Sequence, residues 1–213
     1  MDDLNVNKSL SIIGSGGHAR VIIEAAELTG LKIDCLYDND FNKVNSNVGS
    51  YKVKFPINDN SNDYSIIAIG DNKTRRKVCL EKSKSKWATI IHPLSIISKN
   101  VIIGEGTIVM AGVIIQSGAK IGKHCILNTG VCIDHDCVLD DFVHISPKCG
   151  LAGSVFIGEG TSIGIGSSII PNISIGKWTI VGAGTVVIRD VPDHAVVVGN
   201  PGKIIRYNST END

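Results

Sequence analysis

The residues with the clearest chemical potential are a histidine and the aspartates on either side of it, Asp134, His135 and Asp136. A carboxylate beside an imidazole can hydrogen-bond one ring nitrogen, fix the tautomer and raise the basicity of the ring. A histidine tuned in this way can act as a general base near neutral pH. Exposed histidines without a role are also common, so the assignment depends on where the fold places His135.

A second group of residues, Gly14–Ala19 (GSGGHA), follows a short apolar run and precedes a helical pattern. It fits the G-x-G-x-x-A pattern of phosphate-binding turns, with Asp38 at the end of the next expected strand. Glycines let the backbone approach a phosphate at a helix N-terminus. By itself this pattern suggests a dinucleotide such as NAD, but the expected sheet is too short for a full dinucleotide-binding fold.

The glycine-rich turn belongs to a small α/β unit, which we predict for residues 8–86. The expected strands are Leu10–Ile13, Leu31–Tyr37 and Ser65–Ile69, and the expected helices run from about Val21 to Leu28 and from Lys73 to Lys86. The stretch Asn42–Asn62 is predicted to be loop with one weak strand. This order implies a short, Rossmann-like parallel sheet with its ligand crevice at the carboxyl ends of the strands.

The group Asp134, His135 and Asp136 lies in the second half of the chain, which has a different sequence pattern. From Ile91 to Val187 an aliphatic residue recurs at every sixth position, seventeen times in succession. A period of six matches neither a helix nor a single strand, so it indicates a repeated structural unit. Repeats this short are typical of hexapeptide β-helices, in which three hexapeptides close one coil of about eighteen residues and coils stack at roughly 4.8 Å.

Each position of the hexapeptide has its own character. The fourth residue after each aliphatic one, from Ser95 to Val191, is small or β-branched and therefore interior. The position before it is rich in residues that tolerate positive φ, including glycines, Asn100, Asp136, Asn172 and Asp190, and is predicted to be the corner. The position before the corner points outward. His135 occupies it, which excludes a buried structural role.

Two further residues relate to His135 through the eighteen-residue coil. Gly153 is expected to stack over it, leaving room for a ligand and a backbone N–H that can act as an oxyanion donor. His144 follows His135 by nine residues, half a coil. The two histidines should therefore face different directions within one β-helix and meet only across an interface between subunits, as in a trimer of three-sided prisms.

Several motifs along nearly the whole chain carry a family resemblance. They are GSGGH at Gly14–His18, IAIGDN at Ile67–Asn72, NTGVCIDHDC at Asn128–Cys137, FVHISPKCGLAG at Phe142–Gly153 and VVVGNPGKIIR at Val196–Arg206. With them the chain resembles the bacterial nucleotide-amino-sugar N-acetyltransferases of glycan pathways (PglD type) and the related sialic acid O-acetyltransferases (NeuD type). The resemblance implies that the β-helix is a left-handed parallel one and that the protein is a homotrimer.

The resemblance also implies residue roles. His135 would be the general base and Asp136 its partner, although relatives often have Glu there. The acetyl-CoA groove would be lined by His144, Gly153, Ile165 and Ala183. The sugar nucleotide would contact Gly16, Gly17, His18, Asp38, Asn39 and Gly70, and Asn128 is grouped with the substrate-binding residues. His18 could instead serve as a helix cap.

The expected reaction is direct transfer of the acetyl group of acetyl-CoA to the 4-amino group of a nucleotide-linked 4-amino-4,6-dideoxy sugar, without a metal. The base and the groove do not separate an amine from a hydroxyl acceptor, so O-acetylation of a sialic acid stays open. Three other interpretations are a covalent route through Cys132, a zinc hydratase using His124, His135 and His144, and a non-catalytic sugar-nucleotide-binding trimer.

Composition bounds the partners. Twenty-one basic and twenty-one acidic residues give a formal net charge of zero, so no cationic field favours nucleic acid or an anionic membrane. Neither a signal-peptide pattern nor a membrane-length apolar run is found, so we expect a cytoplasmic protein. The six cysteines form no CxxC pair, and Cys125, Cys137 and Cys149 fall at interior positions. The expected domains are 1–86 (sugar-nucleotide binding), 87–191 (β-helix, acetyl-CoA and catalysis) and 192–213 (C-terminal turn and tail).

Overall fold

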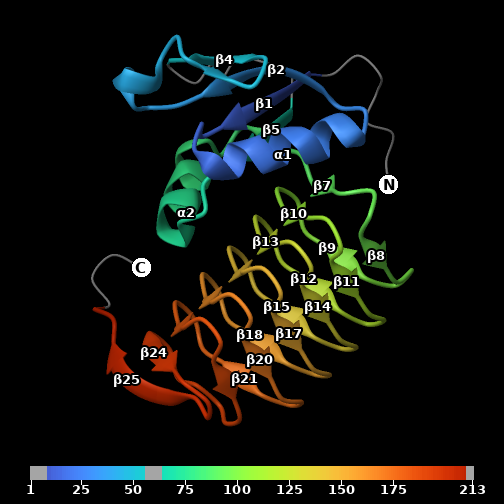
Figure 1. Ribbon diagram of the computed structural model, residues 1–213, viewed down its shortest axis with the longest axis vertical. Coiled ribbons are helices and arrows are strands. Elements are labelled where there is room, and N and C mark those ends of the chain that lie inside the picture. Colours follow the sequence, from blue (N-terminus) through green and yellow to red (C-terminus); the bar gives the residue numbers. More distant parts are fainter. Residues whose placement is uncertain (1–8, 56–63, 210–213) are drawn as a thin grey trace. The chain divides into compact units, whose positions relative to one another are not determined.

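The computed structural model describes residues 9–55 and 64–209. The chain divides into two compact units, Met1–Pro93 and Leu94–Asp213 (Figure 1). The first is an α/β unit and the second a parallel β-helix, so the predicted fold class is confirmed. The domain boundaries proposed at 86/87 and 191/192 stay predictions.

The first unit is built on a six-stranded sheet with the order β3-β4-β2-β1-β5-β6. Its elements are β1 (Ser9–Ile13), α1 (Gly17–Leu28), β2 (Lys32–Tyr37), the 3₁₀ helix η1 (Phe41–Lys43), β3 (Asn47–Val48), β4 (Tyr51–Lys54), β5 (Tyr64–Ile67), α2 (Asn72–Glu81), β6 (Lys86–Trp87) and β7 (Ile90–Ile91). All neighbouring strands of this sheet are parallel except β3 and β4, which form an antiparallel hairpin. Helix α1 lies along the sheet (Figure 1) and buries Ala19, Ile22, Ile23, Ala25 and Ala26.

Two sequence-based expectations for this unit need correction. Between Asn42 and Lys54 the chain forms part of a 3₁₀ helix and a two-stranded hairpin, where a loop with one strand was expected; residues 56–63 of that stretch lie outside the described residues. Helix α2 ends at Glu81, not at Lys86. Lys86 and Trp87 instead pair with Tyr64 and Ser65 at the edge of the sheet, so strand pairing outweighs the helical pattern of this segment.

The second unit consists of short strands at intervals of six residues, arranged on three faces. The first face carries β10 (Ile108–Val109), β13 (Ile126–Leu127), β16 (His144–Ile145), β19 (Ser162–Ile163), β22 (Ile180–Val181), β24 (Ala195–Val198) and β25 (Lys203–Tyr207). The second carries β8 (Ile96–Ile97), β11 (Ile114–Ile115), β14 (Cys132–Ile133), β17 (Gly150–Leu151), β20 (Ser168–Ile169) and β23 (Val186–Val187). The third carries β9 (Ile102–Ile103), β12 (Lys120–Ile121), β15 (Val138–Leu139), β18 (Phe156–Ile157) and β21 (Ser174–Ile175).

Strands on each face pair in parallel with the strand eighteen residues further along, as Ile114 does with Cys132 and Cys132 with Gly150. Two C-terminal pairs differ: β22 pairs in parallel with β24 sixteen residues further along, as Ile180 does with Val196, and β24 and β25 are antiparallel. Every predicted interior residue from Thr107 to Val191 is buried, and all six cysteines are free thiols. The hexapeptide register read from the sequence is therefore confirmed.

The corner positions are confirmed from Gly106 to Gly184, since each has positive φ, including Asp136 at 59°. Asn100 and Asp190 were predicted wrongly, because neither has positive φ. The side chains of these two residues instead accept hydrogen bonds from a neighbouring coil. The Asn100 Oδ1 accepts a hydrogen bond from the Ser117 hydroxyl at 3.0 Å, and the Asp190 Oδ1 accepts one from the Ser174 N–H at 2.8 Å.

One corner contains large aromatic residues that the pattern did not predict. His124, Phe142 and Trp178 are buried at positive-φ positions, and the rings of His124 and Phe142 stack with centroids 5.3 Å apart. Two glycines of the same column provide space for these rings: a Cβ on Gly106 would overlap the ring of His124, and a Cβ on Gly160 would overlap the ring of Trp178. His124 is thus a packed corner residue.

None of the described helices has the length and apolarity that a membrane span requires.

Candidate active site and nucleotide pocket

His135 lies in the turn between β14 and β15, at the outward position expected for it. Its Nδ1 is 2.9 Å from the Asp136 Oδ2, and 58% of the His135 side chain is exposed to solvent. The backbone N–H of His135 donates to the Asp134 Oδ1 at 2.8 Å. Both flanking aspartates therefore bind the histidine, one at the ring and one at the backbone.

The same contacts decide the protonation of His135. The hydrogen bond to Asp136, and then the charge of Asp134, raise the pKa of the imidazole above its ordinary value. When Asp136 accepts the Nδ1 proton, Nε2 is the nitrogen left with a lone pair. The arrangement can accept a proton at Nε2, which is the chemistry of a general base.

Gly153 lies directly against His135, one coil further along. A Cβ built on Gly153 would be 2.5 Å from Nε2 and 2.6 Å from Cε1 of His135. Its φ is not in the left-handed region, so the space occupied by the imidazole is the reason for glycine here. Within residues 9–55 and 64–209, nothing accepts a hydrogen bond from the Gly153 N–H. This N–H is therefore unpaired among the described residues, and Gly153 itself is buried.

The other β-helix residues singled out from the sequence occupy different places. His144 is half-buried on β16, on the first face, and its Nε2 is 3.5 Å from the Asn128 amide nitrogen. His135 belongs to the turn between the second and third faces, so the two histidines do face different directions. Ile165 and Ala183 are exposed, one coil apart, in the turns after β19 and β22.

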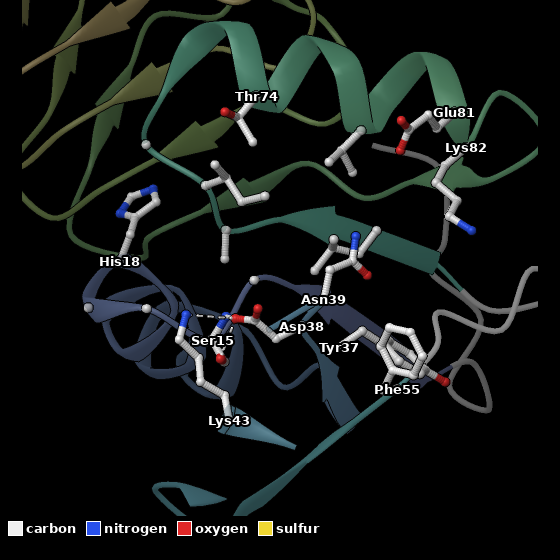
Figure 2. A pocket seen from close by; sticks show the side chains of 18 residues that line it. Ser15, His18, Tyr37, Asp38, Asn39, Lys43, Phe55, Thr74, Glu81 and Lys82 are labelled. Atoms are coloured by element: carbon white, nitrogen blue, oxygen red, sulfur yellow. Dashed lines mark hydrogen bonds and ion pairs between the residues drawn. The ribbon is translucent and has the colours of Figure 1, made fainter. Parts of the chain in front are cut away.

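A pocket of about 770 Å³ lies in the first unit at the carboxyl ends of β1, β2 and β5 (Figure 2). Its walls include all the residues expected to bind a sugar nucleotide there: Gly16, Gly17, His18, Asp38, Asn39 and Gly70. A Cβ on Gly16, Gly17 or Gly70 would meet no atom within 4 Å. These three glycines leave open backbone beside the N-terminus of α1, which suits a phosphate.

Asp38 organises this pocket. Its Oδ2 accepts hydrogen bonds from the Ser15 N–H at 3.0 Å and the Ser15 hydroxyl at 2.5 Å, and forms an ion pair with Lys43 at 3.2 Å. Its Oδ1 accepts from the Asp40 N–H at 2.9 Å. Burial alone would raise the pKa of Asp38, but these hydrogen bonds outweigh burial and lower it. Asp38 is thus a fixed anion that ties the glycine-rich turn to the end of β2.

His18 projects into the pocket from the first turn of α1 (Figure 2). Burial, together with the charge of Arg75, lowers its pKa to about 4, so the ring is neutral at pH 7. The helix N-cap is Gly16 and receives no side-chain hydrogen bond, so His18 is not the cap. Among residues 9–55 and 64–209 its Nε2 has no hydrogen-bond partner, and this atom is buried.

The sequence interpretation missed the other side of the pocket. Lys43, Phe55, Thr74, Glu81 and Lys82 also line it. Figure 2 shows Glu81 and Lys82 at the end of the pocket away from His18. Thr74, Val78 and Glu81 have the spacing of one helix face, which was an available signal in the sequence. The part of the chain that the structure describes contains no group of three or more metal-ligating side chains.

Family comparisons agree with this architecture. The model of the PglD N-terminal domain matches residues 9–81, and the model of the bacterial transferase hexapeptide (six repeats) matches residues 154–189. Fold and repeat together define an acyltransferase of the hexapeptide-repeat class with an N-terminal α/β domain.

Solved structures extend the match to nearly the whole chain. Perosamine N-acetyltransferase from Caulobacter crescentus, in complex with CoA and GDP-perosamine, is 37% identical, with a TM-score of 0.88 over 94% of this chain and 98% of that one. The acetyltransferase domain of PglB from Neisseria gonorrhoeae is 33% identical, with a TM-score of 0.86 over 93% and 100% of the two chains. The chain belongs to the PglD/NeuD-type sugar N-acetyltransferases.

Curated relatives match over shorter segments. The putative acetyltransferase YJL218W of Saccharomyces cerevisiae is 52% identical over 59 residues, which is 28% of this chain. The chain spans only 30% of the length of that relative.

Proposed function

We propose that this protein transfers the acetyl group of acetyl-CoA to the 4-amino group of a nucleotide-linked 4-amino-4,6-dideoxy sugar. The observation that carries the proposal is the His135–Asp136 pair against Gly153, in a chain whose first unit holds a glycine-lined pocket. The neighbour structures support the substrate class, since the Caulobacter enzyme was solved with CoA and GDP-perosamine. The product would serve bacterial surface-glycan biosynthesis, and both co-substrates are cytoplasmic metabolites.

In the proposed step the sugar amine attacks the thioester carbonyl carbon, forming the C–N bond. His135 accepts the proton that the nitrogen loses, at Nε2, while Asp136 stabilises the resulting imidazolium. The Gly153 N–H donates to the oxyanion of the tetrahedral intermediate. The intermediate collapses, the C–S bond breaks and the CoA thiolate leaves with the electron pair. The proton held by His135 then neutralises the thiolate.

The proposed acetyl-CoA groove is lined by Gly153 of one subunit and by His144, Ile165 and Ala183 of an adjacent subunit of a homotrimer. Two observations support this. His144 and His135 lie on different sides of one β-helix. In addition, Ile165 and Ala183 are exposed one coil apart, in the turns after β19 and β22.

We propose GDP as the nucleotide. With the phosphates at Gly16, Gly17 and His18, the base would reach the end of the pocket that holds Glu81 and Lys82. The guanine edge presents one acceptor, O6, followed by two donors, N1–H and the 2-amino group. A lysine and a neighbouring carboxylate offer the complementary donor and acceptors. Uracil and thymine present an acceptor where guanine has its 2-amino group, which a carboxylate would repel.

The deciding experiment measures thiol release from acetyl-CoA with a panel of GDP-, UDP- and dTDP-linked 4-amino sugars and free sialic acid. The proposal expects turnover with a GDP-linked amine and none with sialic acid. His135→Ala should keep the fold and lose at least about 100-fold in kcat/KM. Turnover of the hydroxyl acceptor alone, or an unchanged kcat/KM in His135→Ala, would refute the proposed reaction.

A further inference from the structure

The Asp136 carboxylate has two oxygens with two different environments. Oδ2 forms the hydrogen bond to His135 Nδ1. Oδ1 lies against Gly118, the corner residue one coil before Asp136. A Cβ built on Gly118 would overlap Oδ1 and lie 3.3 Å from Cγ of Asp136. The orientation of the carboxylate therefore depends on two contacts: Oδ2 is hydrogen-bonded to the imidazole, and Oδ1 occupies the space that a side chain at position 118 would fill.

The corner conformation alone does not explain the glycine. Gly118 has φ +79°, but the next three corners of the same column, Asp136, Ser154 and Asn172, have φ of 59° or 60° and carry side chains. A side chain is thus compatible with this corner of the coil. What distinguishes position 118 is the carboxylate that occupies the place where its Cβ would be.

We propose that Gly118 is a positioning residue of the reaction: by lacking a side chain, it lets Asp136 present one oxygen to His135 Nδ1. This inference rests on the proposed role of His135 as the base. A methyl group at position 118 would displace Oδ1, and because the carboxylate is planar, Oδ2 would turn away from Nδ1. The displaced atom is the end of a side chain, so the backbone of the coil would not have to move.

Loss of the Asp136 contact should be visible in the titration of His135. The charged groups acting on the imidazole are Asp136 and Asp134. In Gly118→Ala the hydrogen bond that His135 Nδ1 donates to Asp136 weakens, while the hydrogen bond from the His135 N–H to Asp134 is unchanged. The pKa of His135 should fall toward its ordinary value, and the acid limb of the kcat/KM profile should move to lower pH with it.

The test compares Gly118→Ala, Asp136→Asn and the double variant with Gly112→Ala as the matched control. Gly112 is also a positive-φ corner, at +69°, but a Cβ there would meet only backbone atoms of Gly130 at 3.7 Å or more. We expect kcat to fall roughly tenfold or more in Gly118→Ala, with the KM for acetyl-CoA unchanged. The double variant should be no slower than Asp136→Asn, because both changes remove one interaction. Gly112→Ala should keep the wild-type kcat and KM, and the strain of a side chain at φ +69° should affect only its stability.

Equal losses in Gly118→Ala and Gly112→Ala would overturn the inference, since corner strain would then explain both. Additive losses in the double variant would overturn it as well. A second measurement does not depend on turnover: the NMR titration of the His135 ring, assigned with His135→Ala. A lower His135 pKa in Gly118→Ala supports the positioning role even if no substrate of the panel is acetylated, whereas an unchanged pKa refutes it.

Discussion

Replacing Gly153 by alanine tests whether the imidazole of His135 is held against the next coil. The new Cβ would lie 2.5 Å from Nε2, about 0.9 Å short of the 3.4 Å at which ordinary contact begins. The backbone of Gly153 is fixed by the coil, because its carbonyl accepts from the Asn172 N–H at 3.1 Å. The ring must therefore move by close to 1 Å.

A displacement of about 1 Å at a reacting group costs roughly 100-fold in rate, or about 2.7 kcal/mol of transition-state stabilisation. Alanine keeps the N–H at position 153, so the expected loss is in kcat and comes from the displaced base. Gly150→Ala is the control three residues away, since a Cβ there meets nothing within 4 Å.

The assay is thiol release from acetyl-CoA with the best amine of the panel, together with a thermal unfolding curve for each variant. We expect Gly150→Ala to resemble wild type in both, and Gly153→Ala to unfold normally while losing turnover. A Gly153→Ala enzyme within threefold of the wild-type kcat would refute the reasoning, because the ring would then not depend on the space over Gly153.

Three further predictions concern the pocket and the β-helix. The pKa of His18 falls from about 6.5 in the unfolded chain to about 4 in the folded one, so the unfolded state binds more protons between these pH values, and the free energy of unfolding should fall by up to about 3 kcal/mol as the pH drops from 6.5 to 4. In urea unfolding curves recorded across this pH range, His18→Asn should show a smaller decrease than wild type. An equally steep decrease in His18→Asn would contradict the assignment. Trp178→Ala should lower the free energy of unfolding by roughly 3–5 kcal/mol, because it empties a buried corner over Gly160, and should leave kcat unchanged at a temperature where the variant is folded; calorimetry checks the first and thiol release the second. Glu81→Gln should bind GDP roughly tenfold more weakly than wild type in titration calorimetry, while its affinity for IDP, which lacks the 2-amino group, should fall much less. An equal loss of affinity for GDP and IDP would argue against a carboxylate contact with the 2-amino group.

The hexapeptide register was predictable from the sequence because every coil repeats the same three environments. A residue's place in the period decided whether it is interior, as Cys137 is, or at a corner, as Asp136 is. The period of eighteen also predicted the stacking of Gly153 on His135. Where the stack ends, the repeat of environments is broken, which is why Asn100 and Asp190 departed from the corner pattern.

The pocket was predictable only in part. The glycine-rich turn and Asp38 stand out because their chemistry is local: a turn, a helix start and an acid at a strand end. Phe55 follows β4, and Glu81 and Lys82 lie at the C-terminal end of α2, yet all three line the same pocket. Which face of α2 points there depends on how the helix packs on the sheet. Arg75 holds the segment at the end of β5, because its buried guanidinium donates hydrogen bonds to the carbonyl oxygens of Ile69 and Gly70.

The sequence by itself determined the two architectures, the outward position of His135 and the family, since these depend on residue order and period. The tertiary structure alone decided which atoms meet: Oδ2 of Asp136 at the imidazole, Oδ1 over Gly118, and His18 buried beside the charge of Arg75. The physical reason is that period fixes the direction in which a residue points. Contact distances and burial, which set pKa values and reactivity, depend on side-chain conformations and on neighbours brought together from other coils and strands.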